Sequence, residues 1–161
     1  VLLQEILFNF PSVPIFVAGG IATGKLIAHL VLMGAAGAQM GTRFVSSAES
    51  PVHANYKAAI VQADATGTWL LNKKSTPCIR ALKTQFTAHI HEQGLMPPDT
   101  FTGIRSVYFD GDMEAAPALA GQSAGLIHQV KSAQAIIDDT VAEFMAITRR
   151  LGALGAAGSF G

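Results

Sequence analysis

The sequence contains little that would support a secreted, a metal-binding or a nucleic-acid-binding protein. Its single cysteine, Cys78, excludes an internal disulfide framework and a cysteine zinc site, and it favours a reducing, cytoplasmic compartment. Eleven basic and eleven acidic residues cancel, so no net positive charge points to a nucleic acid as partner. Charged residues make up only 14% of the chain, against roughly 25% in an average globular protein.

Long apolar runs are also missing. The longest weakly polar stretch, residues 26–38, is interrupted by His29 and two glycines, whereas a membrane-spanning helix needs about 20 apolar residues. The first ten residues include Gln4, Glu5 and Asn9 and have no basic start, so they do not resemble a secretory signal. We therefore expect no membrane partner.

Apolar residues are abundant instead, at 50% of the 161 residues. A chain of this length matches one domain, but so few charges leave little to cover its outside. The composition therefore predicts either a subunit with large apolar contacts or a piece of a larger fold. The chain begins with Val1 rather than methionine, from which we expect that it starts within a longer protein.

Residue patterns predict an α/β fold that contains a parallel strand pair. The continuous apolar run 13–18 is typical of a strand buried on both faces. A helix is expected over residues 24–33, with Thr23 as its N-cap and Gly34 at its end. A second strand follows at residues 37–41, which completes a compact βαβ unit.

Other patterns predict further helices and one more strand. The helices are expected over residues 2–10, 52–62, 81–91 and 133–150, and the strand over residues 68–71. One face of the last helix is apolar, made by Ile136, Ile137, Val141, Phe144 and Ile147. The alanine-rich segment 114–128 has glycines at 121 and 125, which indicate close packing.

Two predicted strand ends finish in glycine, at residues 18–20 and 40–42. Glycine lets backbone N–H groups approach an anion without a Cβ in the way. The helix that begins near Gly24 should aim its positive end at the same place. Adjacent glycine loops after late strands form the phosphate site of (β/α)₈ barrels. The alternative is that these glycines only make tight turns.

A nucleotide-binding P-loop is a competing interpretation of the same residues. Gly19, Gly24 and Lys25 have most of the required spacing between a strand and a helix, and residues 107–110 would be the later strand with its aspartate. The mismatch is Leu26, because a P-loop needs a Ser or Thr hydroxyl on the metal at this position.

Several motifs in order resemble the nitronate monooxygenase family, whose pattern flavin-dependent enoyl-acyl carrier protein reductases share. They lie at residues 13–21, 34–44, 49–57, 79–83, 111–114 and 119–127. The resemblance implies the C-terminal portion of a (β/α)₈ TIM barrel with additional helices. It places a partial FMN-binding barrel with a helical insertion at residues 1–148, and a flexible Gly/Ala-rich tail at residues 149–161.

The resemblance also implies a set of cofactor-binding residues. The FMN phosphate would be cradled by Ala18, Gly19, Gly20, Gln39, Met40, Gly41 and Thr42. Gln122 and Ser123 match the segment that approaches the flavin or the substrate, although a polar pair that caps close helix packing fits them equally. No metal site is implied.

The catalytic base is not expected within this sequence. In the family, a glycine-flanked histidine lies just upstream of the strand at residues 13–18, which would place it before Val1. His53 fits the family's Ser-Pro-x-His segment at a helix start, and His29 is expected to be a packed core or edge histidine. His89 and His91 are two residues apart in a helix, so their side chains should diverge. Other polar candidates have structural alternatives: Arg43 an ion pair, and His128, Asp110 and Asp112 a helix end or a loop.

The implied reaction is the FMN-dependent oxidation of alkyl nitronates or nitroalkanes by O₂ to a carbonyl compound and nitrite. An enoyl-acyl carrier protein reductase that uses NAD(P)H is the nearest alternative. A third possibility is an inactive fragment, or a half-barrel that needs a partner chain to supply the first strands. Exposed sheet edges also predict association, including a homo-oligomer.

Overall fold

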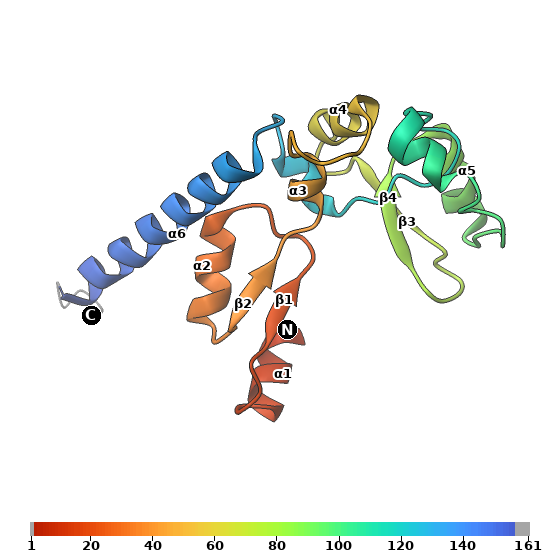
Figure 1. Cartoon of the computed structure of the whole chain (residues 1–161). Helices are drawn as coiled ribbons and strands as arrows, with labels where there is room; N and C mark the ends of the chain where they lie inside the picture. The colour runs from red at the N-terminus through yellow and green to blue at the C-terminus, as the bar shows by residue number, and fades with distance from the viewer. Residues whose placement is uncertain (1, 157–161) are drawn as a thin grey trace. The chain divides into compact units, whose positions relative to one another are not determined.

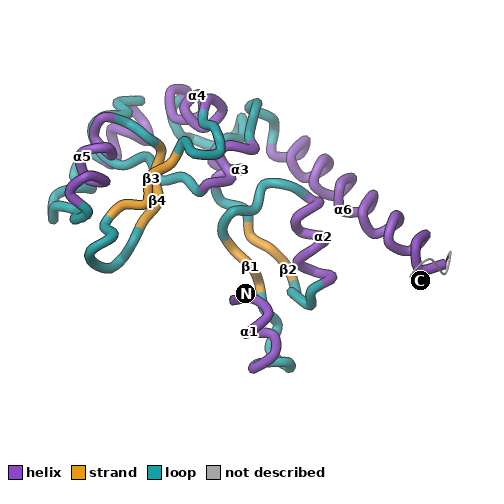
Figure 2. Tube along the Cα trace, turned by 180° about the vertical axis from the view of Figure 1, so that it is seen from behind, coloured by secondary structure: helices purple, strands orange, loops and turns teal. Residues whose placement is uncertain are grey.

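The computed structural model describes residues 2–156, which form two compact units. The first unit combines the residues up to 40 with those from 134 onward, and the second holds residues 41–133. Both units mix helices with short strands, so the predicted α/β class is confirmed (Figures 1 and 2). The strands of residues 2–156 make two two-stranded sheets and no closed barrel. The length alone predicts one domain, whereas the chain forms two compact units.

The first unit contains the predicted βαβ arrangement. Its elements are α1 (Leu2–Asn9), β1 (Phe16–Ala18), α2 (Gly24–Leu32) and β2 (Gly37–Gln39). The two strands are parallel, with Phe16 opposite Gly37 and Ala18 opposite Gln39. Thr23 caps α2, and Gly34 follows the helix with φ +113°, as the sequence predicts.

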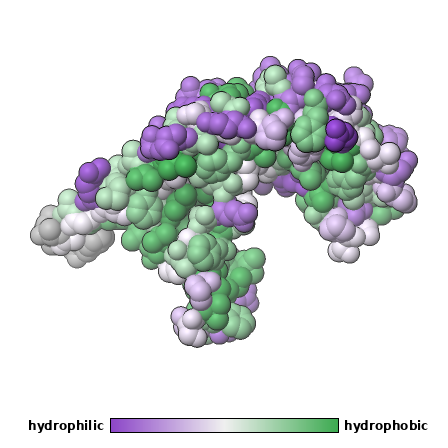
Figure 3. All heavy atoms as spheres, in the orientation of Figure 1, coloured by the Kyte–Doolittle hydropathy of each residue, from purple (hydrophilic) through white to green (hydrophobic). Residues whose placement is uncertain are grey.

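The predicted burial of β1 on both faces is wrong. Phe16 is 68% exposed and Phe8 of α1 is 86% exposed. Figure 3 shows apolar side chains, in green, along the surface of this unit. The physical reason is that β1 pairs only with β2, so no strand of the described chain covers its other edge. A parallel strand normally has neighbours and helices on all sides.

The C-terminal helix α6 (Ala133–Ala156) is longer than the predicted helix over residues 133–150. The helix takes in most of the segment predicted as a tail, and residues 157–161 lie outside the described residues. Its predicted apolar face is only partly correct, since Ile136 is buried but Ile137 and Val141 are exposed. The helix meets α2 through the row that contains Thr140 and Phe144, which turns Ile137 and Val141 outward.

The second unit is a hairpin surrounded by short helices. Its elements are α3 (Thr42–Val45), α4 (Ala54–Gln62), β3 (Thr68–Leu71), β4 (Ile79–Leu82), α5 (Gln85–Gln93), a π-helical turn η1 (Ser106–Asp110) and a 3₁₀ turn η2 (Gln122–Leu126). Strand β3 has the predicted bounds and pairs antiparallel with β4. The prediction of a helix from residue 81 is wrong there, because Ala81 pairs with Trp69 and helix α5 begins only after its cap, Thr84.

Helix α5 covers one face of this hairpin. Leu71, Ala81 and Ile90 are buried together at its centre. At the edge, the rings of Trp69 and His91 stack with centroids 3.9 Å apart. His89 instead contacts Gln93 on the same helix, so the predicted divergence of the two histidines is confirmed.

Tyr56 of α4 is fully buried and links this helix to the segment before η2. Its hydroxyl donates a hydrogen bond to the carbonyl oxygen of Leu119 at 2.6 Å. Its ring packs edge-on against Tyr108, with centroids 5.2 Å apart. Burial, followed by the neighbouring Tyr108, raises the pKa of the Tyr56 phenol well above its ordinary value.

This raised pKa predicts a loss of stability in alkaline solution. Above about pH 10 the unfolded chain releases the Tyr56 proton while the folded chain retains it, so the free energy of unfolding falls as pH rises. Tyr56→Phe removes the hydrogen bond to Leu119 and should cost about 1 kcal/mol at pH 7. Urea unfolding at pH 7 and at pH 10.5 should show a smaller alkaline loss in this variant than in the wild type. An equal loss in both proteins would contradict the assignment.

Candidate functional site

The carboxyl end of β1 opens into a turn of two glycines. Gly19 and Gly20 have φ values of +94° and +71°, a region that side-chain-bearing residues rarely adopt. Both are exposed, and a Cβ added to either would meet no atom within 4 Å. Because Ala18 lies opposite Gln39, the ends of the two parallel strands are side by side. The first unit thus brings together Ala18, Gly19, Gly20, Gln39 and Met40, with open space beside the two glycines.

The remaining predicted site residues, from Gly41 onward, belong to the second unit. Gly41 is exposed with φ −94°, and a Cβ there would also meet open space. The hydroxyl oxygen of Thr42 accepts a hydrogen bond from the backbone N–H of Gly121 at 3.0 Å. This bond holds the start of η2 beside α3, with Gln122 exposed and Ser123 only 5% exposed. The sequence-predicted residues of this unit are therefore neighbours.

The N-terminus of α2 is not open to an external anion in the way the sequence predicts. The backbone N–H of Gly24 donates a hydrogen bond to a carboxylate oxygen of Glu143 in α6 at 2.8 Å. The hydroxyl oxygen of Thr23 accepts from the N–H of Leu26 at 3.3 Å. An internal carboxylate therefore occupies the positive end of this helix. Sequence reasoning missed Glu143 because it lies 119 residues from Gly24, and no local pattern marks it.

Three residues of the sequence motifs have a similar structural role. The carboxylate of Glu49 accepts from the first N–H of α6 at 2.8 Å. Glu114 accepts from the first two amides of α5 at 3.1 and 2.7 Å. His53 is the N-cap of α4, and its Nδ1 accepts from the N–H of Asn55 at 3.1 Å. These side chains satisfy helix-terminal N–H groups, which have no partner within their helix.

Other polar candidates also have internal partners or lie at the surface. His29 is exposed, with Nδ1 2.7 Å from the carbonyl oxygen of Lys25, so of the two predicted positions, core or edge, the core is excluded. Arg43 is buried and donates to the Ser46 hydroxyl and to the carbonyl oxygen of Gln129. Among residues 2–156, no group of three or more His, Cys, Asp or Glu side chains lies together as metal ligands would. No helix within the same range is long and apolar enough to cross a bilayer.

The nucleotide-binding P-loop interpretation is wrong. It requires residues 107–110 to form the strand that carries the magnesium aspartate, but these residues lie in the π-helical turn η1. Glu143 also holds the first N–H of the helix that a P-loop would direct at a phosphate.

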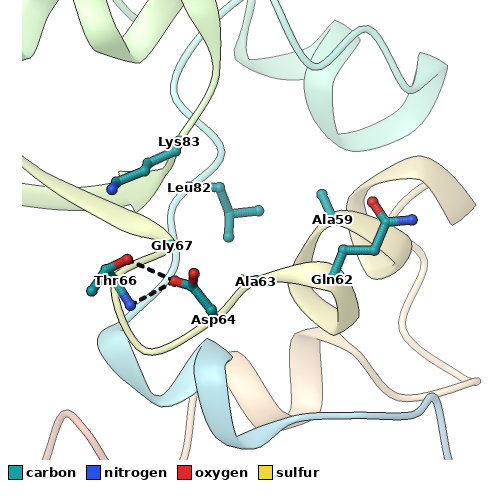
Figure 4. A pocket seen from close by; sticks show the side chains of 8 residues that line it. All are labelled: Ala59, Gln62, Ala63, Asp64, Thr66, Gly67, Leu82 and Lys83. Carbon is teal, nitrogen blue, oxygen red and sulfur yellow. Dashed lines mark hydrogen bonds between the residues drawn. The ribbon is translucent and has the colours of Figure 1, made fainter.

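A shallow hollow on the second unit has a volume of about 290 Å³ (Figure 4). It lies between the end of α4 and the start of the hairpin, and its polar side chains include Asp64 and Lys83. Asp64 accepts hydrogen bonds from the N–H and the hydroxyl of Thr66, which lower the pKa of its carboxyl. The Asp64 carboxylate is thus already engaged in a local turn. We therefore do not regard this hollow as a ligand site.

Comparison with known proteins identifies the family of this chain. The sequence pattern of the family described as nitronate monooxygenase matches residues 2–143. This chain belongs to the nitronate monooxygenase family. A probable nitronate monooxygenase of Staphylococcus saprophyticus is 30% identical over 146 residues, which are 86% of this chain and 41% of that relative. This member of the family therefore spans less than half the length of that relative.

Solved structures of similar proteins give the same coverage. FabK from Thermotoga maritima is 36% identical with a TM-score of 0.87, over 95% of this chain and 50% of its own. A nitroalkane oxidase from Streptomyces ansochromogenes is 24% identical with a TM-score of 0.74, over 93% of this chain and 44% of its own, and shows the fold alone. This member of the nitronate monooxygenase family thus matches about half of each of these two solved structures.

The glycines at the two strand ends predict different responses to alanine. Gly20→Ala places a Cβ on a residue with positive φ and should cost about 1–2 kcal/mol of unfolding free energy. Gly41→Ala meets neither strain nor a neighbouring atom and should stay within about 0.5 kcal/mol of the wild type. Urea unfolding of both variants checks this, and equal losses would contradict the assigned backbone geometry.

Proposed function

We propose that the chain is the phosphate-binding part of an FMN-dependent oxidoreductase of the nitronate monooxygenase type. The observation that carries the proposal is the exposed turn at Gly19 and Gly20, where two residues with positive φ follow a parallel strand and face open space. Such a turn presents backbone N–H groups that an anion can approach without steric hindrance. The phosphate of FMN is the anion that this family membership favours.

Each unit contributes residues to the proposed FMN site. In the first unit, Ala18, Gly19 and Gly20 would hold the phosphate together with Gln39 and Met40, whose strand lies alongside. In the second unit, the open space at Gly41 leaves room for the cofactor.

The segment at the start of η2 would lie near the flavin ring or the substrate. The Thr42 hydroxyl oxygen fixes the Gly121 amide, and with it the position of Gln122 and Ser123. Gln122 is exposed, so its amide is available to donate a hydrogen bond to a bound molecule.

When bound, FMN would supply the electron transfer, and the protein would supply binding, orientation and electrostatics. The proposed substrates are an alkyl nitronate or nitroalkane and O₂, with a carbonyl compound and nitrite as products. We propose that the proton-abstracting base belongs to the half of the family's fold that this chain does not span. Within residues 2–156, His53 is engaged as a helix cap and His91 lies between Leu70 and Lys73.

The exposed edge of β1 supports the addition of further strands to this half of the fold. We propose that the (β/α)₈ barrel is completed by the strands that precede β1 in the family's fold, supplied by the same protein or by a complementing chain. The exposed Phe16 and the unpaired edge of β1 would be covered by this addition.

Flavin binding tests the proposal directly. The purified chain should quench FMN fluorescence and retain the cofactor through desalting. Gly41→Ala should weaken FMN binding roughly tenfold, because the new Cβ would occupy open space that the proposed cofactor fills. Gly152→Ala is the matched control, since it also meets no atom within 4 Å but lies in α6. No FMN binding by the wild type, or equal weakening in both variants, would contradict the proposal.

Turnover distinguishes the proposed substrate from its nearest alternative. The FMN-loaded protein, with the complementing half present, should consume O₂ and release nitrite from an alkyl nitronate. Reduction of a 2-enoyl thioester by NAD(P)H without nitrite release would instead favour the flavin-dependent enoyl reductase.

A further inference from the structure

The C-terminal helix meets the start of α2 at very short range. Gly24, the first residue of α2, is buried, and a Cβ at this position would collide with the backbone carbonyl oxygen of Thr140 in α6. The backbone nitrogen of Phe144 lies on the same side, 2.9 Å from that Cβ position. No residue larger than glycine fits here without moving one of the two helices.

This close approach places one carboxylate on the first amide of α2. The Glu143 side chain, one residue before Phe144, accepts the Gly24 N–H at 2.8 Å. Only Ile21, Ala22 and Thr23 separate Gly24 from the glycine turn, and Ile21 is 3% exposed. The segment after the turn is therefore anchored at Ile21, at the Thr23 cap and at the bond to Glu143.

The N-terminus of α2 and the glycine turn before it differ in their electrostatic surroundings. A helix N-terminus carries a positive charge of roughly half an elementary unit, which favours one anion within its first turn. Glu143 already supplies that anion to α2. A phosphate placed on the same amides would lie against the carboxylate, and two like charges at such range repel each other. The exposed glycine turn lies before this first helical turn, separated from it by residues 21–23.

We propose that Glu143 is a positioning residue for the phosphate-binding turn. It fixes the start of α2 and thereby the segment from Gly19 to Thr23, and it directs the phosphate to the turn instead of the first turn of the helix. Glu143 touches neither phosphate nor flavin. This inference rests on the proposed FMN function, and its experiment separates the two.

Hydrogen exchange tests the positioning role without a cofactor. Glu143→Ala should speed exchange of the Gly24 and Leu26 amides at least tenfold, because the acceptor of the Gly24 N–H is lost and the start of α2 loosens. Glu143→Gln keeps an amide oxygen at the same place and should restore most of the protection. Asp138→Ala is the matched control on the same helix, since its carboxylate accepts a local hydrogen bond from Gln134 of that helix. Unchanged exchange in Glu143→Ala would overturn the inference.

A comparison of FMN with riboflavin, which lacks the phosphate, gives the second readout. Wild type should prefer FMN, and Glu143→Ala should lose roughly tenfold of FMN affinity while its riboflavin affinity stays unchanged. Equal weakening for both flavins would show a general structural defect and overturn the positioning role. A wild type that binds both flavins equally would contradict the proposed function, while the exchange result would still decide the role of Glu143.

Discussion

The contact between Gly24 and the helix row of Thr140, Glu143 and Phe144 is the constraint on which the first unit depends. It joins residues 119 positions apart and fixes where α2 begins. The start of α2 in turn fixes how the chain leaves β1, because only a short segment separates the two. The geometry of the glycine turn is therefore set partly by the far end of the sequence, and the long α6 has a role beyond covering the unit.

In both units, side chains from elsewhere in the chain or from the N-cap accept hydrogen bonds from N–H groups at helix N-termini. Glu143, Glu114 and Glu49 place carboxylates on the first amides of α2, α5 and α6, and an imidazole nitrogen of His53 accepts the second amide of α4, that of Asn55. These four helix ends have internal partners, which disfavours an external anion there, whereas α3 begins after Gly41 without a side-chain cap. The motif residues Glu49, His53 and Glu114 thus contribute to the architecture, and in the proposed function recognition of the phosphate is assigned to the glycine turn.

Local chemistry allowed part of this structure to be predicted from sequence. The Thr23 cap, the parallel pair of β1 and β2 and the bounds of β3 follow from residues close to one another in the chain. Strand β4 was missed because Ile79–Leu82 is defined by its pairing across the hairpin rather than by its own pattern. The exposure of Phe16 and the carboxylate of Glu143 depend on what packs against each residue over long distances, which periodicity does not reveal.

We propose that the glycine turn, and not the N-terminus of α2, holds the flavin phosphate. A crystal structure of the chain with FMN tests this most directly. The account predicts phosphate oxygens about 3 Å from the backbone nitrogens of Gly19 and Gly20, with the bond between Glu143 and the Gly24 N–H retained. A phosphate seated on the first amides of α2, with the Glu143 side chain turned away, would contradict it.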